Sequence, residues 1–487
     1  MLYIGAILTG MMNNHRTFLK GLTSTVASNL ISFLISTIVI IVVPKLIGVA
    51  EYGYWQLYLF YSSYVGFLHF GWNDGVYLRY GGEEYTALDK NTFNSQFVSF
   101  VLFQLLISIA VFIYAIIYVP NEDRQFILCS IAVCLVLTNV RGFLIFTLQA
   151  TNRLYEYAII TIIERVFYLF LIISLISLGF RQYKLMILSD IMGKLVSCAY
   201  AIYICREFTL LYRRKIIFDF KEIYANISVG IKLMFANIAS MFIIGAVRFG
   251  IEKSWDIATF GKVSLTLSIS SMMMIFISAV GVVLYPQLRR IDTSGQVNAY
   301  NKINSLLNIC LLALLIIYFP AKEIIQYWLP KYSDALIYMG LLFPLCFFEG
   351  KMSLLLNTYL KVLRLEKIML RVNICCLIIS VAFTAVSSLV LHNLYITVCV
   401  IPFVLFVRSV FVELYLQRKL NIRRTNNTLI SSIVVLSFFV LVASFSTLMS
   451  LLLYISIYAI YLYVYKKDLI MLKEMMISAY KSLKKQD

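Results

Sequence analysis

Residues 96–118 read QFVSFVLFQLLISIAVFIYAIIY, a run of 23 residues without one charged side chain. A transmembrane helix needs about 20 consecutive, predominantly apolar residues, whereas a transmembrane strand needs about 10. The run is therefore long enough for a membrane-spanning helix and too long for a barrel strand. This segment decides the fold class, because similar segments recur along the whole chain.

The composition agrees with a membrane protein. Of the 487 residues, 61% are hydrophobic and 14% are charged, whereas soluble globular domains have about 45–50% apolar and about 25% charged residues. No soluble core absorbs so much apolar surface. The sequence therefore predicts an all-α polytopic integral membrane protein.

Fourteen segments are apolar over about 20 residues each, which is the length of a membrane span. Twelve spans followed by a re-entrant segment is the main alternative, because the last two segments form a tight hairpin. The segments are residues 22–43, 54–72, 96–118, 126–148, 158–179, 184–205, 227–250, 260–285, 304–320, 335–359, 368–390, 394–416, 428–446 and 448–465.

The basic residues of the loops predict the orientation in the membrane. If the N-terminus is cytoplasmic, the loops and tails on that side hold roughly four times as many Lys and Arg residues as the opposite loops. Cytoplasmic loops carry such an excess, so we expect both termini in the cytoplasm. The basic amphipathic tail after residue 465 either lies on the anionic inner leaflet or acts as an ordinary positive-inside signal.

No loop is long enough to form a catalytic or binding domain outside the membrane. The longest covers residues 206–226, on the cytoplasmic side. The formal charge of +18 follows from the loop asymmetry and does not predict a nucleic-acid surface, which would cluster on a solvated domain. The nine cysteines lie in or at the ends of apolar runs, and no metal-ligand spacing, phosphate loop or nucleophile elbow is present. We expect no cofactor and no enzymatic activity.

An internal repeat is visible when the chain is compared with itself at an offset of 208 residues. Six of the 25 positions from Gly53 to Tyr77 are identical at that offset. The alignment relates the second span to the eighth and predicts two six-helix lobes with a seam between them. The predicted parts are residues 1–210 and 211–427 for the lobes, and 428–487 for two further helices with the basic tail.

Twelve ionisable residues within the predicted spans are candidates for functional charges, because a charge there costs about 2.5–3.5 kcal/mol on insertion scales and usually faces the bundle interior. Asp190 and Lys194 are four residues apart on one helix face, which predicts an ion pair. The neighbouring charges at 164–165 and 349–351 do not share a face, so their partners are expected elsewhere. The twelve are Arg141, Glu164, Arg165, Asp190, Lys194, Lys232, Arg248, Lys262, Glu349, Lys351, Arg408 and Glu413.

The seventh span carries positive charge without an acid. Lys232 and Arg248 lie near its two ends, and Lys262 opens the eighth span. Glu252 and Asp256, in the loop between the spans, are candidate partners of Arg248 or Lys262. Two interpretations remain open: a cationic cavity that attracts a phosphate or diphosphate head group, or side chains that snorkel to the two membrane interfaces.

Three segments carry a resemblance to a known family. Residues 44–60, PKLIGVAEYGYWQLYLF, and 71–82, GWNDGVYLRYGG, resemble the N-terminal pattern of bacterial polysaccharide flippases. These are the Wzx-type O-antigen and capsule-unit translocases of the multidrug/oligosaccharidyl-lipid/polysaccharide (MOP) exporter superfamily. Residues 260–290, FGKVSLTLSISSMMMIFISAVGVVLYPQLRR, resemble the corresponding segment of the second half.

The resemblance implies two six-helix lobes around a central cavity, with two extra C-terminal helices. It implies alternating-access transfer of an undecaprenyl-diphosphate-linked oligosaccharide from the cytoplasmic to the outer leaflet of the bacterial inner membrane, for O-antigen, capsule or exopolysaccharide assembly. Membrane lipids, a polysaccharide polymerase and a chain-length regulator become candidate partners. Spans one, two, seven and eight would line the cavity, which makes Lys232, Arg248, Lys262 and Arg79 candidates for diphosphate contact.

The segment FGWNDGVYLRYGGEEY, residues 70–85, ends the second span. Trp72 and Tyr77 fit an aromatic belt at the cytoplasmic interface, and residues 73–75 are expected to turn or kink the helix end. Arg79 then lies at head-group depth, either as a diphosphate contact or as an ordinary interfacial arginine. Gly81-Gly82 are expected to end the element before a polar loop.

Two other functions are compatible with a chain of this class. A MATE-like drug or cation exporter would need a cavity dominated by unpaired acids, and acids are outnumbered in the central spans. A membrane polysaccharide polymerase would need a large external loop with catalytic residues. Coupling to protons or sodium would need a titratable acid in the cavity, for which the candidates are Asp190, Glu164, Glu349 and Glu413.

Overall fold

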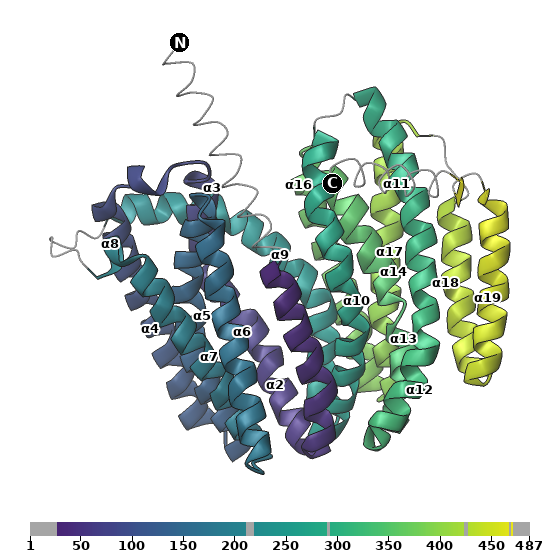
Figure 1. Ribbon diagram of the computed structural model, residues 1–487, viewed down its shortest axis with the longest axis horizontal. Helices are drawn as coiled ribbons and strands as arrows, with labels where there is room; N and C mark the ends of the chain where they lie inside the picture. The colour runs from purple at the N-terminus through teal and green to yellow at the C-terminus, as the bar shows by residue number, and fades with distance from the viewer. Residues whose placement is uncertain (1–26, 211–218, 290–292, 423–426, 467–468, 471–487) are drawn as a thin grey trace, which may run out of the picture. The chain divides into compact units, whose positions relative to one another are not determined.

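The computed structural model describes residues 27–210, 219–289, 293–422, 427–466 and 469–470 (Figure 1). Every regular element in these ranges is a helix. The chain divides into two compact units, Met1–Ile238 and Ala239–Asp487. The lobe boundary predicted at residues 210 and 211 lies at the edge of residues outside the described ranges, so it stays a prediction.

Eleven helices of the described ranges are long and apolar enough to cross a membrane. The predicted all-α polytopic membrane protein is thereby confirmed. Each of the fourteen predicted spans overlaps helical segments over most of its length, although residues 22–26 of the first lie outside the described ranges. Two of the fourteen are shorter than the rest, namely α2 (Val49–Val65) and the apolar part of α18, Leu429–Ser444.

The first unit is a bundle of long helices joined by short turns. The side chain of Asp89 caps α4 by accepting a hydrogen bond from the backbone N–H of Asn91. The side chain of Asn121 caps α5 in the same way, by accepting a hydrogen bond from the backbone N–H of Arg124. Pro120, just before that second cap, ends the preceding helical segment. The elements are the helix Ala27–Leu46, α2, η1 (Gly66–His69), α3 (Trp72–Arg79), η2 (Tyr85–Ala87), α4 (Lys90–Tyr118), α5 (Glu122–Ala150), α6 (Leu154–Ser177), α7 (Tyr183–Ile204), α8 (Arg206–Thr209) and the first part of α9 (Phe220–Ser254).

An aromatic core holds the segment around Trp72, which the sequence predicted to lie at a membrane interface. Trp72 is 3% exposed and packs edge-on against Phe100, whose ring stacks on Phe143. The indole Nε1 donates to Gln96 Oε1 at 3.3 Å. The prediction that Trp72 belongs to an aromatic belt is therefore wrong, because the indole is buried in this core, whereas Tyr77 is 41% exposed.

The turn after α2 comes earlier than residues 73–75, where the sequence predicted it. Phe70 and Gly71 have φ values of 52° and 83°, and α3 begins directly after them. Residues 73–75 are therefore helical. Gly82, with φ of 99°, follows the end of α3, so the predicted termination at Gly81-Gly82 is confirmed.

The glycines of this segment let α3 cross α9 at backbone contact. A Cβ at Gly75 would lie 2.0 Å from the carbonyl oxygen of Asn226, and one at Gly230 would lie 1.9 Å from that of Gly71. Only glycine fits at such a crossing, as in the small-xxx-small contacts of membrane helices. This contact explains why an apolar span ends in a glycine-containing helix rather than in a simple polar loop.

The second unit is built around one highly buried composite helix. In the most apolar stretch of the segment Pro330–Val362, 89% of the residues are buried, compared with 17% in the corresponding stretches of α4 and of α19 (Thr447–Val464). It is interrupted at Pro344 and contains a π-helical turn, η5 (Met352–Leu356). Such turns in membrane helices occur frequently at functional sites. The segment consists of η4 (Pro330–Ala335), α13 (Leu336–Leu342), α14 (Leu345–Lys351), η5 and α15 (Asn357–Val362).

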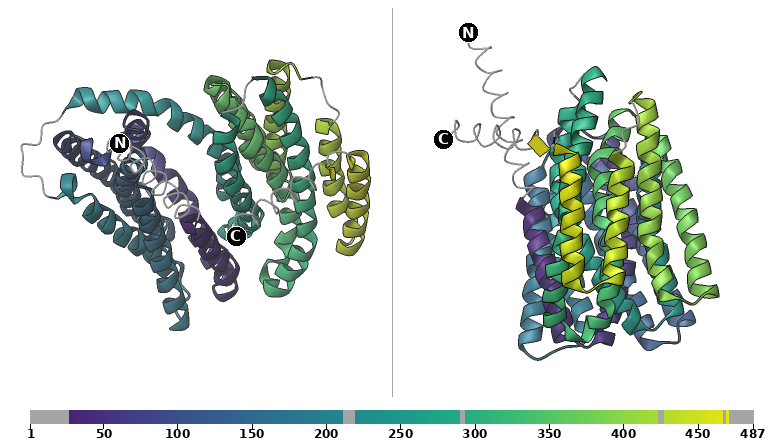
Figure 2. Two further views of the ribbon diagram at one scale, coloured as in Figure 1. Left: turned by 45° about the horizontal axis from the view of Figure 1, so that its top comes forward. Right: turned by 90° about the vertical axis from the view of Figure 1, so that its right-hand side faces the viewer.

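The remaining helices of the second unit surround that segment. Figures 1 and 2 show α18 and α19, the last two described helices, side by side as a hairpin. The other elements are the rest of α9, α10 (Ile257–Arg289), α11 (Thr293–Leu314), η3 (Leu315–Ile317), α12 (Tyr318–Trp328), α16 (Glu366–Ala385), the π-helical η6 (Val386–Val390), α17 (Leu394–Lys419), α18 (Asn427–Ser444) and α19.

Candidate functional site

Helix α9 carries two of the predicted cationic residues and belongs to both units. Its 35 residues extend over about 52 Å, well beyond the hydrocarbon thickness of about 30 Å. The boundary between the units falls after Ile238, so Lys232 lies in the first unit and Arg248 in the second. Arg79 likewise belongs to the first unit and Lys262 to the second.

The spacing on α9 keeps Lys232 and Arg248 apart. Sixteen residues of a continuous α-helix correspond to about 24 Å along the axis and roughly 160° around it. The two side chains therefore cannot contact one phosphate group at the same time while the helix is intact. If both Lys232 and Arg248 contact one head group, as the sequence suggested, they have to do so one after the other.

Arg79, at the end of α3, is tied to the first turns of α9. Its guanidinium makes a two-point ion pair with Glu222, Nη1–Oε1 at 2.7 Å and Nη2–Oε2 at 3.1 Å. Nη1 also donates to Asn226 Oδ1 at 2.7 Å, and the hydroxyl of Tyr80 donates to Glu222 Oε1 at 2.6 Å. The hydrogen bond to Glu222 raises the pKa of Arg79 above its ordinary value. Arg79 is therefore charged and engaged in a tie between α3 and α9.

Lys232 differs from Arg79 in its surroundings. It is exposed, and no acid of the described ranges lies within ion-pair distance of it. A lysine in such a position can reach a ligand without first breaking an ion pair. Among the four predicted cations, it is the one whose environment best suits first contact with an anion.

Arg248 and Lys262 lie on the two helices that meet at the other end of α9. Arg248 donates from Nη2 to Ser264 Oγ at 3.1 Å, and its guanidinium lies 5.4 Å from the centre of the Phe260 ring. These contacts hold Arg248 against the first turns of α10, the helix that also carries Lys262. Lys262 itself pairs with Asp334 of η4 at 2.5 Å, and not with an acid of the loop between α9 and α10.

The acids predicted as coupling candidates in the first unit are both neutralised. Asp190 pairs with Lys194 one turn away on α7, as the sequence predicted, and accepts a hydrogen bond of 2.7 Å from the hydroxyl of Tyr58. Glu164 of α6 pairs with Arg141 of α5. The expectation that the partner of Glu164 lies elsewhere in the chain is therefore confirmed.

The two acids of the second unit pair across one helix interface. Glu349 and Lys351 of α14 pair with Arg408 and Glu413 of α17, at 2.6 Å and 2.8 Å respectively. Both side chains of the Lys351–Glu413 pair are 1% exposed. Asn304 of α11 donates to Glu413 Oε1 at 3.1 Å, so a third helix joins the cluster. The neighbouring charges at 349 and 351 thus have separate partners, as expected.

Several residues of this arrangement were not singled out from the sequence. Tyr58 and Asn304 act as hydrogen-bond donors to buried acids, a role that no local spacing predicts. The glycines of the α3–α9 crossing carried a usable signal, because Gly71 and Gly75 form a small-xxx-small pattern. All nine cysteines are free. In the described ranges no three His, Cys, Asp or Glu side chains are placed to hold a metal ion.

Comparison with solved structures identifies the fold. The chain is similar to the lipid II flippase MurJ in an inward closed conformation, with a TM-score of 0.62 and 13% identity over 93% of this chain and 100% of that chain. It is also similar to an inward-facing multidrug resistance MATE family transporter of the MOP superfamily, with a TM-score of 0.59 and 11% identity over 81% of this chain and 98% of that chain. The fold is that of MOP-superfamily transporters.

A further structure with the same fold is a MATE protein in complex with MaD5, with a TM-score of 0.53 and 12% identity over 82% of this chain and 96% of that chain. No protein-family model and no curated protein matches the sequence. The MOP-type fold is shown by the arrangement of the helices.

Proposed function

We propose that this protein is a flippase for a lipid-linked oligosaccharide. In this proposal, it transfers an undecaprenyl-diphosphate-linked repeat from the cytoplasmic to the outer leaflet of a bacterial inner membrane, by alternating access. The observation that carries the proposal is the charge balance of the membrane helices. Glu164, Asp190, Glu349 and Glu413 are each paired with a cation, whereas Lys232 is exposed without an acid of the described ranges beside it.

An anionic head group suits this balance better than a cationic drug does. A cation needs an acid that is free to receive it, and each of the four candidate acids would first have to release Lys or Arg. A diphosphate needs donors and positive charge. Lys232 offers an ammonium directly, and the guanidinium of Arg248 contacts the Ser264 hydroxyl and the ring of Phe260. The similarity to the fold of a lipid II flippase supports the same substrate class.

The positions of the cations suggest an order of contacts. Lys232 lies in the half of α9 that starts at residue 220, where Arg79 of α3 is tied to Glu222, and Arg248 lies in the other half, near the start of α10 with Lys262. With the orientation predicted from the loops, the first pair lies toward the cytoplasm and the second toward the outer leaflet. We propose that the diphosphate contacts Lys232 on entry and Arg248 before release, since the distance on α9 excludes simultaneous contact.

The same orientation places both termini in the cytoplasm. A polysaccharide polymerase and a chain-length regulator would act on the transferred repeat at the outer face. Coupling to an ion would require one of the paired acids to exchange its partner, and Asp190 is the simplest candidate, because its partner is on its own helix and Tyr58 continues to donate to it.

A deletion strain tests the proposed function. Its lipid-linked repeat should accumulate on the cytoplasmic leaflet, measured as the fraction of the glycolipid protected from a membrane-impermeant periodate label in spheroplasts. Loss of a polymerase would instead leave single repeats at the outer face. A repeat that is exported normally in the deletion strain would rule the flippase out.

Single substitutions test the site within that strain. Lys232→Ala and Arg248→Ala should each reduce export of the repeat without lowering the amount of protein in the membrane. Lys361→Ala, at an exposed lysine of α15, is the matched control and should restore export fully. Normal export by both α9 variants would remove these residues from the proposed site.

The fold also fits a MATE-like exporter, since MATE structures share it. That alternative predicts that the deletion strain becomes sensitive to cationic drugs while its lipid-linked repeat is distributed normally. Measuring drug sensitivity in the same strain separates the two functions.

A further inference from the structure

Arg165 is a charged residue in the middle of a membrane-spanning helix, α6. It is the twelfth of the 24 residues of that helix, which places it about 17 Å from either end. Its side chain is partly buried, and no residue of the described ranges forms a hydrogen bond or an ion pair with it. The sequence singled out Arg165 as a charge within a span, and the contacts proposed on α9 do not account for it.

Snorkelling does not explain this arginine. Its side chain is much shorter than the distance to either end of α6, so the guanidinium cannot reach a membrane interface. A charge at such depth faces the bundle interior or a water-filled cavity, and residues of this kind mark the paths of substrates and ions. Arg165 therefore needs an anion within the first unit.

Helical spacing fixes the side of α6 on which Arg165 lies. At about 100° per residue, position 165 falls between positions 172 and 169 around the helix axis. Ile172 and Leu169 line the groove between α6 and the helix Ala27–Leu46. Arg165 consequently faces the helix Ala27–Leu46, one turn before Leu169, which is the first residue of α6 in that apolar groove.

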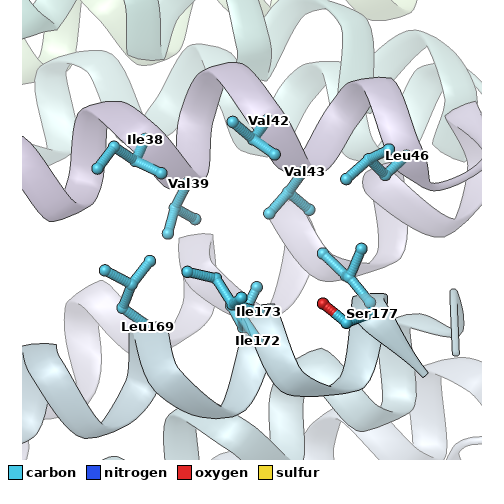
Figure 3. A pocket seen from close by; sticks show the side chains of 10 residues that line it. Ile38, Val39, Val42, Val43, Leu46, Leu169, Ile172, Ile173 and Ser177 are labelled. Carbon is cyan, nitrogen blue, oxygen red and sulfur yellow. The ribbon is translucent and has the colours of Figure 1, made fainter. Parts of the chain in front are cut away.

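The facing helix also becomes polar beyond the apolar groove. Figure 3 shows Val39 opposite Leu169 and Leu46 near Ser177, so the two helices run in the same direction. Ser32 lies two turns before Val39 on the same face, and its Oγ is buried without a hydrogen-bond partner in the described ranges. Since helical side chains lean toward the N-terminus of their helix, the guanidinium of Arg165 extends toward the level of Ser32.

The charges around Arg165 do not cancel. Arg165 is close enough to Asp190 and to Arg141 for an electrostatic interaction with each. Both acids at this depth are already engaged, since Asp190 pairs with Lys194 and Glu164 pairs with Arg141. Three cations thus accompany two acids, and Arg165 is the cation left over.

We propose that Arg165 and Ser32 form a diphosphate-binding subsite in the middle of the membrane. The inference rests on the proposed function, in which the head group passes from Lys232 to Arg248, about 24 Å further along α9. The guanidinium binds two phosphate oxygens at once, and the serine hydroxyl donates to another. The subsite thereby supplies a contact at the depth where the head group is furthest from both membrane surfaces.

Binding of an isoprenoid diphosphate to the full-length protein tests the subsite. Geranylgeranyl diphosphate and its uncharged counterpart, geranylgeraniol, are titrated into the detergent-purified protein and followed by microscale thermophoresis. We expect the wild type to bind the diphosphate more tightly than the alcohol. Arg165→Gln should lower the affinity for the diphosphate about tenfold, and Ser32→Ala about fivefold, as expected for the loss of a charged and of a neutral hydrogen bond. Arg165→Lys, which keeps the charge, should retain part of the affinity.

Stability separates a binding role from a structural one. Without ligand, Arg165→Gln should unfold at the temperature of the wild type or above it, because the substitution breaks no hydrogen bond or ion pair of the described ranges. Arg181→Gln is the matched control, at an exposed arginine just beyond the end of α6. It should leave the affinity for the diphosphate unchanged.

The outcomes distinguish the subsite from the proposed function. Equal affinity of the wild type and of folded Arg165→Gln for the diphosphate overturns the subsite, and so does wild-type binding of the alcohol that is as tight as that of the diphosphate. Neither result affects a flippase whose deletion strain accumulates the repeat inside. If that strain exports its repeat normally while Arg165→Gln loses affinity, the flippase is wrong and the diphosphate subsite stands. If Arg165→Gln does not fold, unchanged affinity in Ser32→Ala overturns the subsite instead.

Discussion

The two units distribute their ion pairs differently among their helices. In the first unit α3 meets α9 through glycines at backbone contact, the Asp190–Lys194 pair lies within a single helix, and one pair, Arg141–Glu164, joins α5 to α6. In the second unit two buried ion pairs join the same two helices, α14 and α17. In both units the acids predicted as coupling candidates are paired with a cation.

The difference has a mechanical consequence. The Asp190–Lys194 pair within α7 persists when neighbouring helices shift, whereas the single Arg141–Glu164 pair breaks if α5 and α6 separate. Two pairs between α14 and α17 must break together if those helices separate, and each would leave a buried charge. The second unit should therefore be the stiffer of the two at this interface. The following variants test the contrast.

Removing one partner of the most buried pair should have the largest effect. Lys351→Ala leaves Glu413 at 1% exposure without its cation, which should lower the free energy of unfolding by about 3–5 kcal/mol. The double variant Lys351→Met with Glu413→Leu should recover most of that loss, because a buried pair replaced by apolar side chains is often neutral. Thermal unfolding in detergent, followed by tryptophan fluorescence, measures both. A single variant as stable as the wild type would show that the pair is hydrated.

The equivalent substitution in the first unit should cost less. The side chains of Lys194 and Asp190 are 11% and 5% exposed, against 1% for both members of the Lys351–Glu413 pair, so the charge left in Lys194→Ala is less fully desolvated and we expect a loss of about 1.5–3 kcal/mol. The same unfolding assay compares it directly with Lys351→Ala. A larger loss for Lys194→Ala than for Lys351→Ala would reverse the proposed contrast between the units.

The glycine crossing should respond to a single methyl group. Gly75→Ala forces a Cβ against the Asn226 carbonyl and should cost about 1–3 kcal/mol through overpacking. Gly66→Ala is the control, since a Cβ there meets nothing within 4 Å. Equal stability of the two variants would mean that α3 and α9 are not in backbone contact.

The smallest effect is expected at the partly exposed tie between α3 and α9. Arg79→Gln removes the ion pair with Glu222 and should cost about 0.2–1 kcal/mol. The loss should shrink at high salt, because screening weakens exposed pairs. A loss that is independent of salt would indicate that the Asn226 hydrogen bond, rather than the charge, carries the stabilisation.

The positions of the spans could be predicted from the sequence because length and apolarity alone determine them. The Asp190–Lys194 pair was also predictable, since its two residues lie on one helix face. The partners of Glu164 and Glu349 were not, because they depend on which helices pack together. Trp72 was misassigned for the same reason: an aromatic residue beside polar ones fits an interface as well as a core, and only the packing of α3 against α4 decides.

The candidate site was predicted less completely than the fold. The sequence singled out the four cations but not their partners, so it could not show that Arg79 and Lys262 are engaged while Lys232 is exposed. Helical geometry, available from the sequence, already separates Lys232 from Arg248 on α9. That separation is the reason for proposing two successive contacts in place of one shared contact.

The most direct test of the central claim is transfer of the substrate by the purified protein. A fluorescent undecaprenyl-diphosphate oligosaccharide is placed in proteoliposomes, and its arrival in the outer leaflet is followed by quenching with dithionite. We predict faster transfer with the wild type than in protein-free vesicles, slower transfer with Lys232→Ala, and wild-type transfer with Lys361→Ala. Wild-type vesicles that transfer the glycolipid no faster than protein-free ones would contradict the account.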